Sequence, residues 1–241
     1  MIKITVKHKC RSCQSENIVK NGRNASGNQQ YRCKDCDACK VLEPTVRYSE
    51  GRKEEILRAY QERASLRGVC RVFGVSRPTV AAWLKKLRGL PKVADGLAEA
   101  HPGDVLELDE VCGYVHKRRN KVWTWTALCR RTRQIVAYVN GDRGEVTCRV
   151  LWGRIPEAYR RCRTFSDFWK AYANVFSEAQ HLSVGKETGE TAHMERWNNT
   201  LRQRIGRMVR KTLSFSKDAT WHDGVIHWFV VSYNSSVSVN I

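Results

Sequence analysis

A stretch late in the chain combines one acid with a dense run of bases. Glu195 stands near its start, and residues 196–211 contain six Arg or Lys residues and no acid. Such a run repels itself unless a polyanion lies beside it, and nucleic acid is the natural polyanion. At helical spacing Glu195, Asn198 and Arg202 share one face. An acid on a surface that faces nucleic acid needs a reason, and the best one is binding of a divalent metal ion.

Two further acids, Asp109 and Asp167, belong to stretches that read as strands. Three carboxylates that one fold brings together can bind two Mg²⁺ ions, which Mn²⁺ can replace, and such a pair serves phosphoryl transfer. Each acid has another interpretation. Glu107 and Glu110 compete with Asp109, Asp167 can cap the helix that follows it, and Glu195 can pair with a nearby arginine. In this basic context the three acids together favour a metal site.

Four cysteines form two Cys-x2-Cys pairs that are separated by nineteen residues: Cys10, Cys13, Cys33 and Cys36. Two turns that each present two thiolates complete a tetrahedral zinc site, and the protein then fills every coordination position, so this metal is structural. The alternative is four unrelated thiols in a small core. Cys39 repeats the spacing and is interpreted as spare. We expect a zinc ribbon over residues 1–45.

A helix-turn-helix unit is predicted over residues 50–90. Its spacing shows a short apolar helix, a turn at Gly74 and a second helix that Ser76 caps. The side chains expected to pack inward are Val80, Trp83, Leu84 and Leu87. Those expected to face DNA are Arg77, Thr79, Lys85 and Lys86. The alternative is a helical hairpin with a solvated basic face, but the adjoining zinc unit favours DNA binding.

After a linker at 91–103, the pattern predicts one larger domain over residues 104–241. Alternation and helical periodicity predict strands at 104–110, 122–128 and 134–140, a helix at 145–154, a strand at 163–167, a helix at 169–176, a strand at 181–184 and a helix at 191–208. A meander followed by alternating units implies an α/β domain with a mixed sheet and helices on its faces. The order matches the ribonuclease H-like arrangement.

Composition limits the possible partners. The 241 residues include 43 basic and 24 acidic ones, so the net charge is +19. No apolar run approaches the roughly 20 residues of a spanning helix, which makes a membrane partner improbable. The ten cysteines in a chain without an apolar leader favour metal ligation over disulfides. We therefore expect a cytoplasmic protein that associates with the nucleoid.

The combined motifs resemble transposases of the insertion sequence 1 family, which are DDE enzymes on a ribonuclease H-like fold. The resemblance covers nearly the whole chain. Besides the cysteine pairs and the helix-turn-helix, it rests on Glu107-Leu108-Asp109-Glu110, Asp167-Phe168-Trp169-Lys170, Glu195-Arg196-x-Asn198-x-x-Leu201-Arg202 and Arg210-Lys211-Thr212-Leu213-Ser214-Phe215-Ser216-Lys217. It implies that Asp109, Asp167 and Glu195 are the metal ligands. It also implies that Arg202 contacts DNA near them.

The resemblance further implies how such a protein acts on double-stranded DNA. The zinc ribbon and helix-turn-helix bind the terminal inverted repeats, and the acids support strand cleavage and joining to target DNA. Two ends must be held together, so a homodimer or higher oligomer is expected. Beyond the helix-turn-helix, the residues expected on DNA are Lys117, Arg118, Arg119, Asn198, Arg202, Arg204, Arg207, Arg210 and Lys211. Two alternatives are a DNA-binding regulator and a nuclease without strand transfer.

Overall fold

The computed structural model describes residues 7–25, 27–44, 48–62, 65–86 and 89–238. The chain divides into two compact units, Met1–Lys53 and Glu54–Ile241. The first unit is an antiparallel sheet in the order β1-β2-β3, with strands at Ile18–Arg23, Gln29–Cys33 and Cys39–Lys40. Gly22 lies near the end of β1 and Gly27 lies in the turn after it, and both have positive φ.

The second unit begins within α1 (Glu50–Gln61) and continues with α2 (Leu66–Phe73) and α3 (Arg77–Lys86). Ser65 caps α2 by accepting a hydrogen bond from Gly68 N at 2.9 Å. Gly74, at φ 68°, ends the helix in the left-handed region. The side chains of these helices and of the turn that are buried are Ile56, Val69, Val75, Val80 and Leu84. The helix-turn-helix pattern is therefore present; Trp83 is half-buried, and Leu87 lies outside the described residues.

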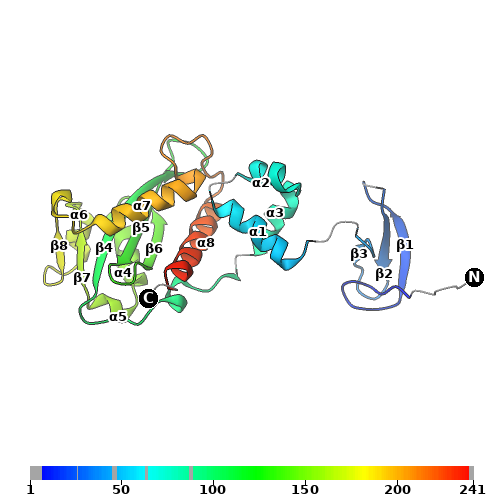
Figure 1. Ribbon diagram of the computed structural model, residues 1–241, viewed down its shortest axis with the longest axis horizontal. Helices are drawn as coiled ribbons and strands as arrows, with labels where there is room; N and C mark the ends of the chain where they lie inside the picture. The colour runs from blue at the N-terminus through cyan, green and yellow to red at the C-terminus, as the bar shows by residue number, and fades with distance from the viewer. Residues whose placement is uncertain (1–6, 26, 45–47, 63–64, 87–88, 239–241) are drawn as a thin grey trace, which may run out of the picture. The chain divides into compact units, whose positions relative to one another are not determined.

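A five-stranded mixed sheet forms the centre of the second unit (Figure 1). Its strands are β4 (Val105–Tyr114), β5 (Lys121–Cys129), β6 (Ile135–Gly141), β7 (Arg163–Ser166) and β8 (His181–Ser183). The order across the sheet is β6-β5-β4-β7-β8. β4, β5 and β6 pair antiparallel, whereas β7 is parallel to β4 and β8 is parallel to β7. The predicted mixed α/β architecture is confirmed.

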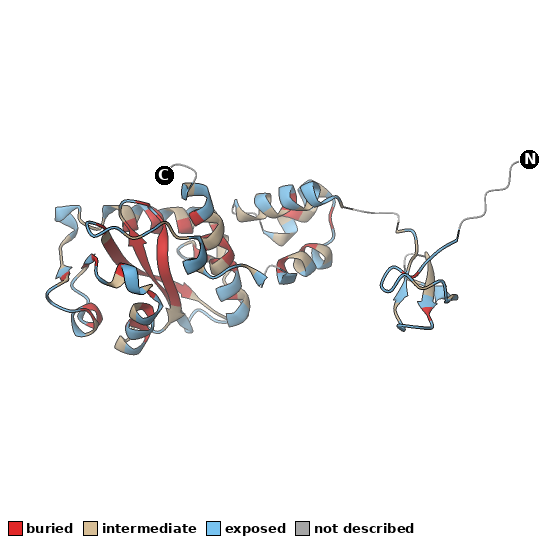
Figure 2. Cartoon of the chain, turned by 90° about the horizontal axis from the view of Figure 1, so that it is seen from below, coloured by how far each residue is buried: buried red, intermediate tan, exposed pale blue. Residues whose placement is uncertain are grey.

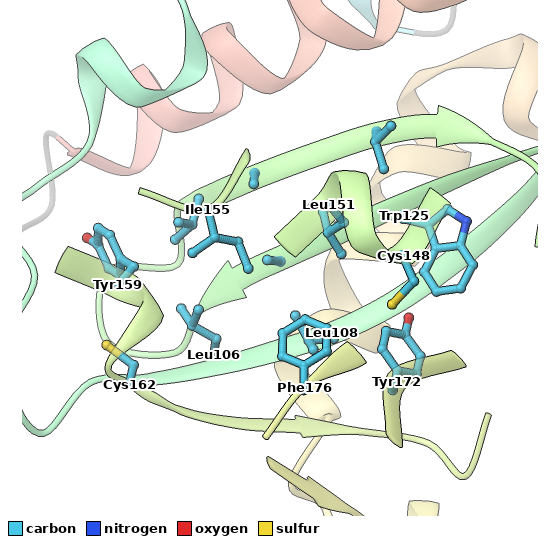
Figure 3. Close-up of a cluster of buried hydrophobic side chains, with 14 of the residues drawn as sticks. Leu106, Leu108, Trp125, Cys148, Leu151, Ile155, Tyr159, Cys162, Tyr172 and Phe176 are labelled. Carbon is cyan, nitrogen blue, oxygen red and sulfur yellow. The ribbon is translucent and has the colours of Figure 1, made fainter. Parts of the chain in front are cut away.

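Both faces of this sheet are buried under helices, and Figure 2 shows the buried residues along its strands. One face packs against α4 (Glu145–Arg154), α5 (Glu157–Arg160) and α6 (Lys170–Val175). Figure 3 shows part of that core, where Leu106 and Leu108 of β4 face Leu151, Ile155 and Phe176. The other face packs against α7 (Ala192–Arg204) and α8 (Ala219–Ser238). Successive β4 side chains therefore alternate between two different layers of helices.

The unit also contains short 3₁₀ turns, which among the described elements are Val93–Gly96, Lys186–Thr188 and Gly206–Met208. The first of them lies in the stretch expected to be a linker, and it is held to the sheet. Gln134 Nε2 donates to Gly96 O at 2.9 Å, and its Oε1 accepts from Ala98 N at 2.9 Å. This stretch is therefore packed against the domain that it precedes.

The helices differ from the sequence prediction in three respects, the first being that the four-residue α5 was not predicted. The helix expected over 191–208 ends at Arg204, and the chain continues through Ile205 into the third 3₁₀ turn. The 20-residue α8 was not predicted. Among the described residues, no helix is both long enough and apolar enough to cross a membrane.

Candidate active site

The parallel pairing of β4 with β7 brings two predicted acids together. The register pairs Glu107 with Phe165, so Asp109 on β4 and Asp167 just after β7 come to the same place in the sheet. One carboxylate oxygen each from Asp109, Asp167 and Glu110 lies within 4.8 Å of the others. We call these three residues the carboxylate cluster. Asp109 and Asp167 were predicted to meet, whereas Glu110 was considered only as a competitor of Asp109.

Asp109 is half-buried in the cluster, and its carboxylate accepts two hydrogen bonds. Its Oδ1 accepts a hydrogen bond from Glu110 N at 2.7 Å, and its Oδ2 accepts one from Asn198 Nδ2 at 2.6 Å. Burial, followed by the nearby negative charge of Glu110, raises the pKa of Asp109 to about 7. The surrounding protein therefore leaves this carboxylate short of positive charge. Oxygen donors with uncompensated negative charge are the ligands that a hard divalent cation prefers, so the residues present fit such an ion.

Glu110 points to the opposite face of the sheet and is fixed there. Its Oε1 accepts from Arg143 Nε at 2.8 Å and lies 2.6 Å from Arg143 Nη2, and its Oε2 accepts from Tyr172 OH at 2.8 Å. The Arg143 guanidinium in turn lies over the rings of Trp123 and Trp169, at 4.6 and 4.2 Å from their centroids. Burial raises the pKa of Glu110. Because both of its oxygens already have protein partners, Glu110 is a fixed neighbour of the two aspartates.

Asp167 combines the two interpretations that its sequence position allowed. Its Oδ1 accepts a hydrogen bond from Trp169 N at 3.0 Å, which orders the turn before α6. It also belongs to the carboxylate cluster. A carboxylate has enough acceptor sites for both contacts.

Glu195 is outside the carboxylate cluster in this structure. It lies in the first turn of α7, its side chain is 44% exposed, and its Oε1 is 3.8 Å from Lys186 Nζ. Asn198, one turn further along the same helix, reaches Asp109. Glu195 therefore lies on the helix that contacts the cluster, one turn before the contact. Its assignment as a metal ligand stays a prediction.

Glu107 is held by hydrogen bonds to residues outside the carboxylate cluster. Its side chain is fully buried, with Oε1 accepting from Arg130 Nε at 2.8 Å and lying 2.7 Å from His193 Nδ1. Its Oε2 accepts from Met194 N at 2.9 Å, in the first turn of α7. Arg130 also pairs with Glu190, just before the helix. Glu107 thus anchors the beginning of α7 to β4, which the sequence did not reveal.

The four predicted cysteines converge in the first unit. The Sγ atoms of Cys10 and Cys36 are 3.6 Å apart, those of Cys13 and Cys33 are 3.5 Å apart, and all four lie within 4.8 Å of one another. Cys39 is not in this set, and its Sγ accepts from Asn21 Nδ2 at 3.1 Å. Four thiols at these separations fit one tetrahedral zinc ion.

Two equivalent turns produce this convergence. Gln14 N donates to Cys10 O at 2.9 Å and Asp37 N donates to Cys33 O at 3.0 Å, and both donor residues have positive φ, 63° and 58°. Each Cys-x2-Cys pair is thereby folded back on itself. The backbone N–H groups of Cys13 and Ser12 lower the pKa of Cys10 to about 6, whereas the neighbouring thiols raise the pKa of Cys13 and of Cys36.

The residues expected on DNA differ in their exposure to solvent. The exposed ones are Arg77, Lys85, Lys86, Lys117, Arg118, Arg119, Arg210 and Lys211. Thr79 is half-buried, and its Oγ1 lies 2.7 Å from Ser76 Oγ. Arg202 is half-buried, and its Nε is buried without a hydrogen-bond partner among the described residues.

Three of the residues predicted to contact DNA have partners within the protein. Asn198 is 5% exposed and binds Asp109. Arg204 pairs with Glu62, just after α1, and Arg207 Nη2 donates to Tyr60 OH of α1 at 3.1 Å. The sequence pattern shows only that this segment is basic, whereas the structure shows that Arg204 and Arg207 have partners within the protein. Arg204 and Arg207 also line a groove of about 800 Å³. The described residues that line this groove include no acid and five cationic residues, which are Arg67, Arg77, Arg204, Arg207 and Lys217.

Comparison with known proteins agrees with this architecture. Residues 105–234 match the sequence model of the IS1 transposase family, residues 3–37 match the InsA N-terminal domain zinc ribbon, and residues 47–94 match a homeodomain-like domain. The chain is 35% identical over 128 residues to the insertion element iso-IS1n protein InsB of Shigella dysenteriae, covering 52% of this chain and 93% of that protein. It is 32% identical over 162 residues to an insertion element IS1 protein InsB of Escherichia coli, covering 63% of this chain and 92% of that protein.

These matches define a DDE transposase with zinc-ribbon and helix-turn-helix DNA-binding regions. The chain belongs to the IS1 transposase family. The family implies a divalent metal at the catalytic acids, and the predicted transposase function is confirmed at this level.

Proposed function

We propose that this transposase binds the terminal inverted repeats of its own element, cleaves one strand at each end and joins the freed end to target DNA. The catalytic part is residues 104–241, with a ribonuclease H-like fold. The strand order β6-β5-β4-β7-β8, with three antiparallel strands and two parallel ones, supports this fold. The observation that carries the proposal is the meeting of Asp109 and Asp167 at one place in that sheet.

In this proposal Asp109, Asp167 and Glu195 hold two Mg²⁺ ions. When bound there, the ions supply Lewis-acid activation of the attacking hydroxyl and stabilise charge on the reacting phosphate. Asn198 keeps the Asp109 carboxylate in one orientation, and Glu107 holds the start of α7, which carries Glu195. Water hydrolyses a phosphodiester and frees a 3′-hydroxyl. That hydroxyl then forms a bond to a target phosphorus while the target 3′-oxygen leaves, so no protein–DNA covalent bond is needed.

Recognition of the element ends is assigned to the two N-terminal regions. Cys10, Cys13, Cys33 and Cys36 would hold a structural zinc ion over residues 1–45. In the helix-turn-helix of residues 50–90, the helix α3 carries the exposed basic residues Arg77, Lys85 and Lys86. The cationic groove beside it supports contact with a phosphate backbone. Because two ends must be joined in one event, the acting species is a homodimer or a higher oligomer on DNA.

The test is cleavage of a duplex that carries the element's own end, with and without Mg²⁺. Wild type is expected to cut at the end, and Asp109→Asn is expected to bind the repeat without cutting it, because the amide removes a charged ligand. Glu195→Gln should behave like Asp109→Asn if Glu195 is the third ligand. Binding without any cutting by wild type would contradict the proposal. Cutting without products joined to target DNA would instead indicate a nuclease.

A further inference from the structure

Phe168 is an exposed aromatic residue that adjoins the carboxylate cluster in sequence. It directly follows Asp167, and its side chain is 71% exposed. Single exposed apolar side chains are common on protein surfaces, but one that directly follows a residue of a reaction site is a candidate contact for the substrate. The question is therefore what covers Phe168 during the reaction.

The backbone around Phe168 is held on both sides. Asp167 Oδ1 accepts from Trp169 N at 3.0 Å, and Trp169 Nε1 donates to Arg143 O at 3.2 Å. The Trp169 ring also lies against the Arg143 guanidinium, which pairs with the buried Glu110. Phe168 is thus the exposed middle residue of a turn whose two neighbours are anchored. Its outward position follows from ordered contacts on either side.

The charge of the chain as a whole, rather than that of the adjacent carboxylates, indicates the partner. The chain has a net charge of +19, and Phe168 is followed at two residues by the exposed Lys170. A polyanion that also offers flat apolar faces matches both features, and nucleic acid has this combination. In a paired duplex the base faces are covered by their neighbours, so a base must leave its stack to meet the Phe168 ring.

We propose that Phe168 stacks on a nucleobase that flanks the scissile phosphate and is unpaired during the reaction. The inference rests on the proposed function, because it takes Asp109 and Asp167 as the place where the phosphate reacts. Phe168 then contacts substrate directly, and the ring compensates for part of the free energy lost when the base leaves its stack. A second copy of this chain would be the other possible cover for an exposed aromatic ring, and the test separates the two.

The first measurement compares cleavage of two duplexes that carry the element's end. One is fully paired, and the other has mismatches at the base pairs that flank the cleavage position. Phe168→Ala should cut the paired duplex about tenfold or more slowly than wild type, since stacking on an aromatic ring contributes this much per base. The mismatched duplex should restore its rate to within about threefold, because the base is already unpaired. Phe168→Trp should keep wild-type behaviour, and Val150→Ala, an exposed apolar residue of α4, serves as the matched control.

The second measurement needs no cleavage. The adenine analogue 2-aminopurine is placed in turn at each flanking position, and its fluorescence is recorded in complexes formed without divalent ions. A change at one position that is present with wild type and Phe168→Trp, and absent with Phe168→Ala, is the expected result.

The outcomes are distinct. Equal cleavage of the paired duplex by wild type and Phe168→Ala, or a loss that mismatches do not restore, would overturn the stacking proposal. If Phe168→Ala has a lower molecular mass than wild type in analytical ultracentrifugation and leaves the 2-aminopurine signals unchanged, the ring serves self-association. This result would also overturn the stacking proposal. If wild type cuts neither duplex, the proposed function fails, and the fluorescence measurement still decides whether Phe168 holds a base.

Discussion

Asn198 Nδ2 lies 2.6 Å from Asp109 Oδ2, and this hydrogen bond joins α7 to β4 at the carboxylate cluster. Glu107, two residues earlier on the same face of β4, accepts from Met194 N at the start of α7. One helix is therefore attached to one strand at two points, four residues apart on the helix. The attachment fixes where α7 presents Glu195, which lies between the two contact residues.

Replacing Asn198 should impair the reaction more than binding. Without its amide, the Asp109 carboxylate loses an orienting donor, and loss of such a partner next to a metal ligand typically costs about 10- to 100-fold. We expect Asn198→Ala to reduce single-turnover cleavage by that factor with little change in affinity for the terminal repeat. Asn199→Ala, at the exposed neighbouring position, is the control. Equal rates for the two variants would argue against a positioning role.

The raised pKa of Asp109 predicts a pH-dependent stability of the metal-free protein. The folded state holds the proton up to a pH of about 7, whereas the unfolded chain releases it near 3.8. This contribution is therefore complete below the unfolded value and is lost as the pH rises through about 7, amounting to about 4 kcal/mol at most. The difference in unfolding free energy between wild type and Asp109→Asn, measured in chelator from pH 5 to pH 8, should change in favour of the variant as the pH rises. A flat difference would contradict the burial-driven shift.

Glu107→Ala should destabilise the second unit strongly. The substitution leaves Arg130 and His193 without the buried carboxylate that both contact, and breaking a buried ion pair in this way costs about 3–5 kcal/mol. The expected result is a clear drop in melting temperature together with faster hydrogen exchange in α7. Glu178→Ala, an exposed acid outside this network, should stay within about 0.5 kcal/mol of wild type. A melting temperature like that of the control would show that Glu107 is not an anchor.

Cys33→Ser should remove the metal from the first unit. Cys33 is 1% exposed and lies among the four converging thiols, so its loss leaves three ligands for a tetrahedral ion. Zinc content measured by mass spectrometry should fall well below one ion per chain, and affinity for the terminal repeat should fall with it. Cys39→Ser, which changes a thiol outside the cluster, should keep both. Loss of zinc in the Cys39 variant would mean that the ligand set is wrong.

The strands were predictable because their sequences alternate or are continuously apolar, as a sheet buried on both faces requires. The helix α8 was missed for a related reason. Its buried residues include Val225, Ile226, Phe229 and Val230, and Trp228 stacks on Tyr60 with ring centroids 6.1 Å apart. A helix that is covered on several sides has no single apolar stripe, and a run rich in β-branched and aromatic residues gives no clear helical period.

The candidate site was predictable in part. Alternation placed Asp109 and Asp167 at predicted strands, and the resemblance to a ribonuclease H-like fold implied that they meet, whereas the parallel pairing that brings them together is visible only in the structure. The partners of Glu107 and Glu110 did not follow, since Arg130, Arg143 and Tyr172 are distant in sequence and only the packed fold brings them in. Charge counting likewise could not distinguish Arg204, which pairs with Glu62, from the exposed Arg210. Sequence shows that a segment is basic, but the assignment of each charge needs coordinates.

The contacts of α1 have a consequence for the geometry of the proposed DNA complex. Gln61 Nε2 donates to Ser232 Oγ of α8 at 2.8 Å, and Tyr60 accepts from Arg207, so the helix-turn-helix is attached to the domain that carries the acids. The number of base pairs between the sequence read by α3 and the bond that is cut then becomes a property of the protein. An element end lengthened by half a helical turn would present the wrong side of the double helix to Asp109. The arrangement would thus measure a distance along DNA as well as read a sequence, and an end would be defined by both.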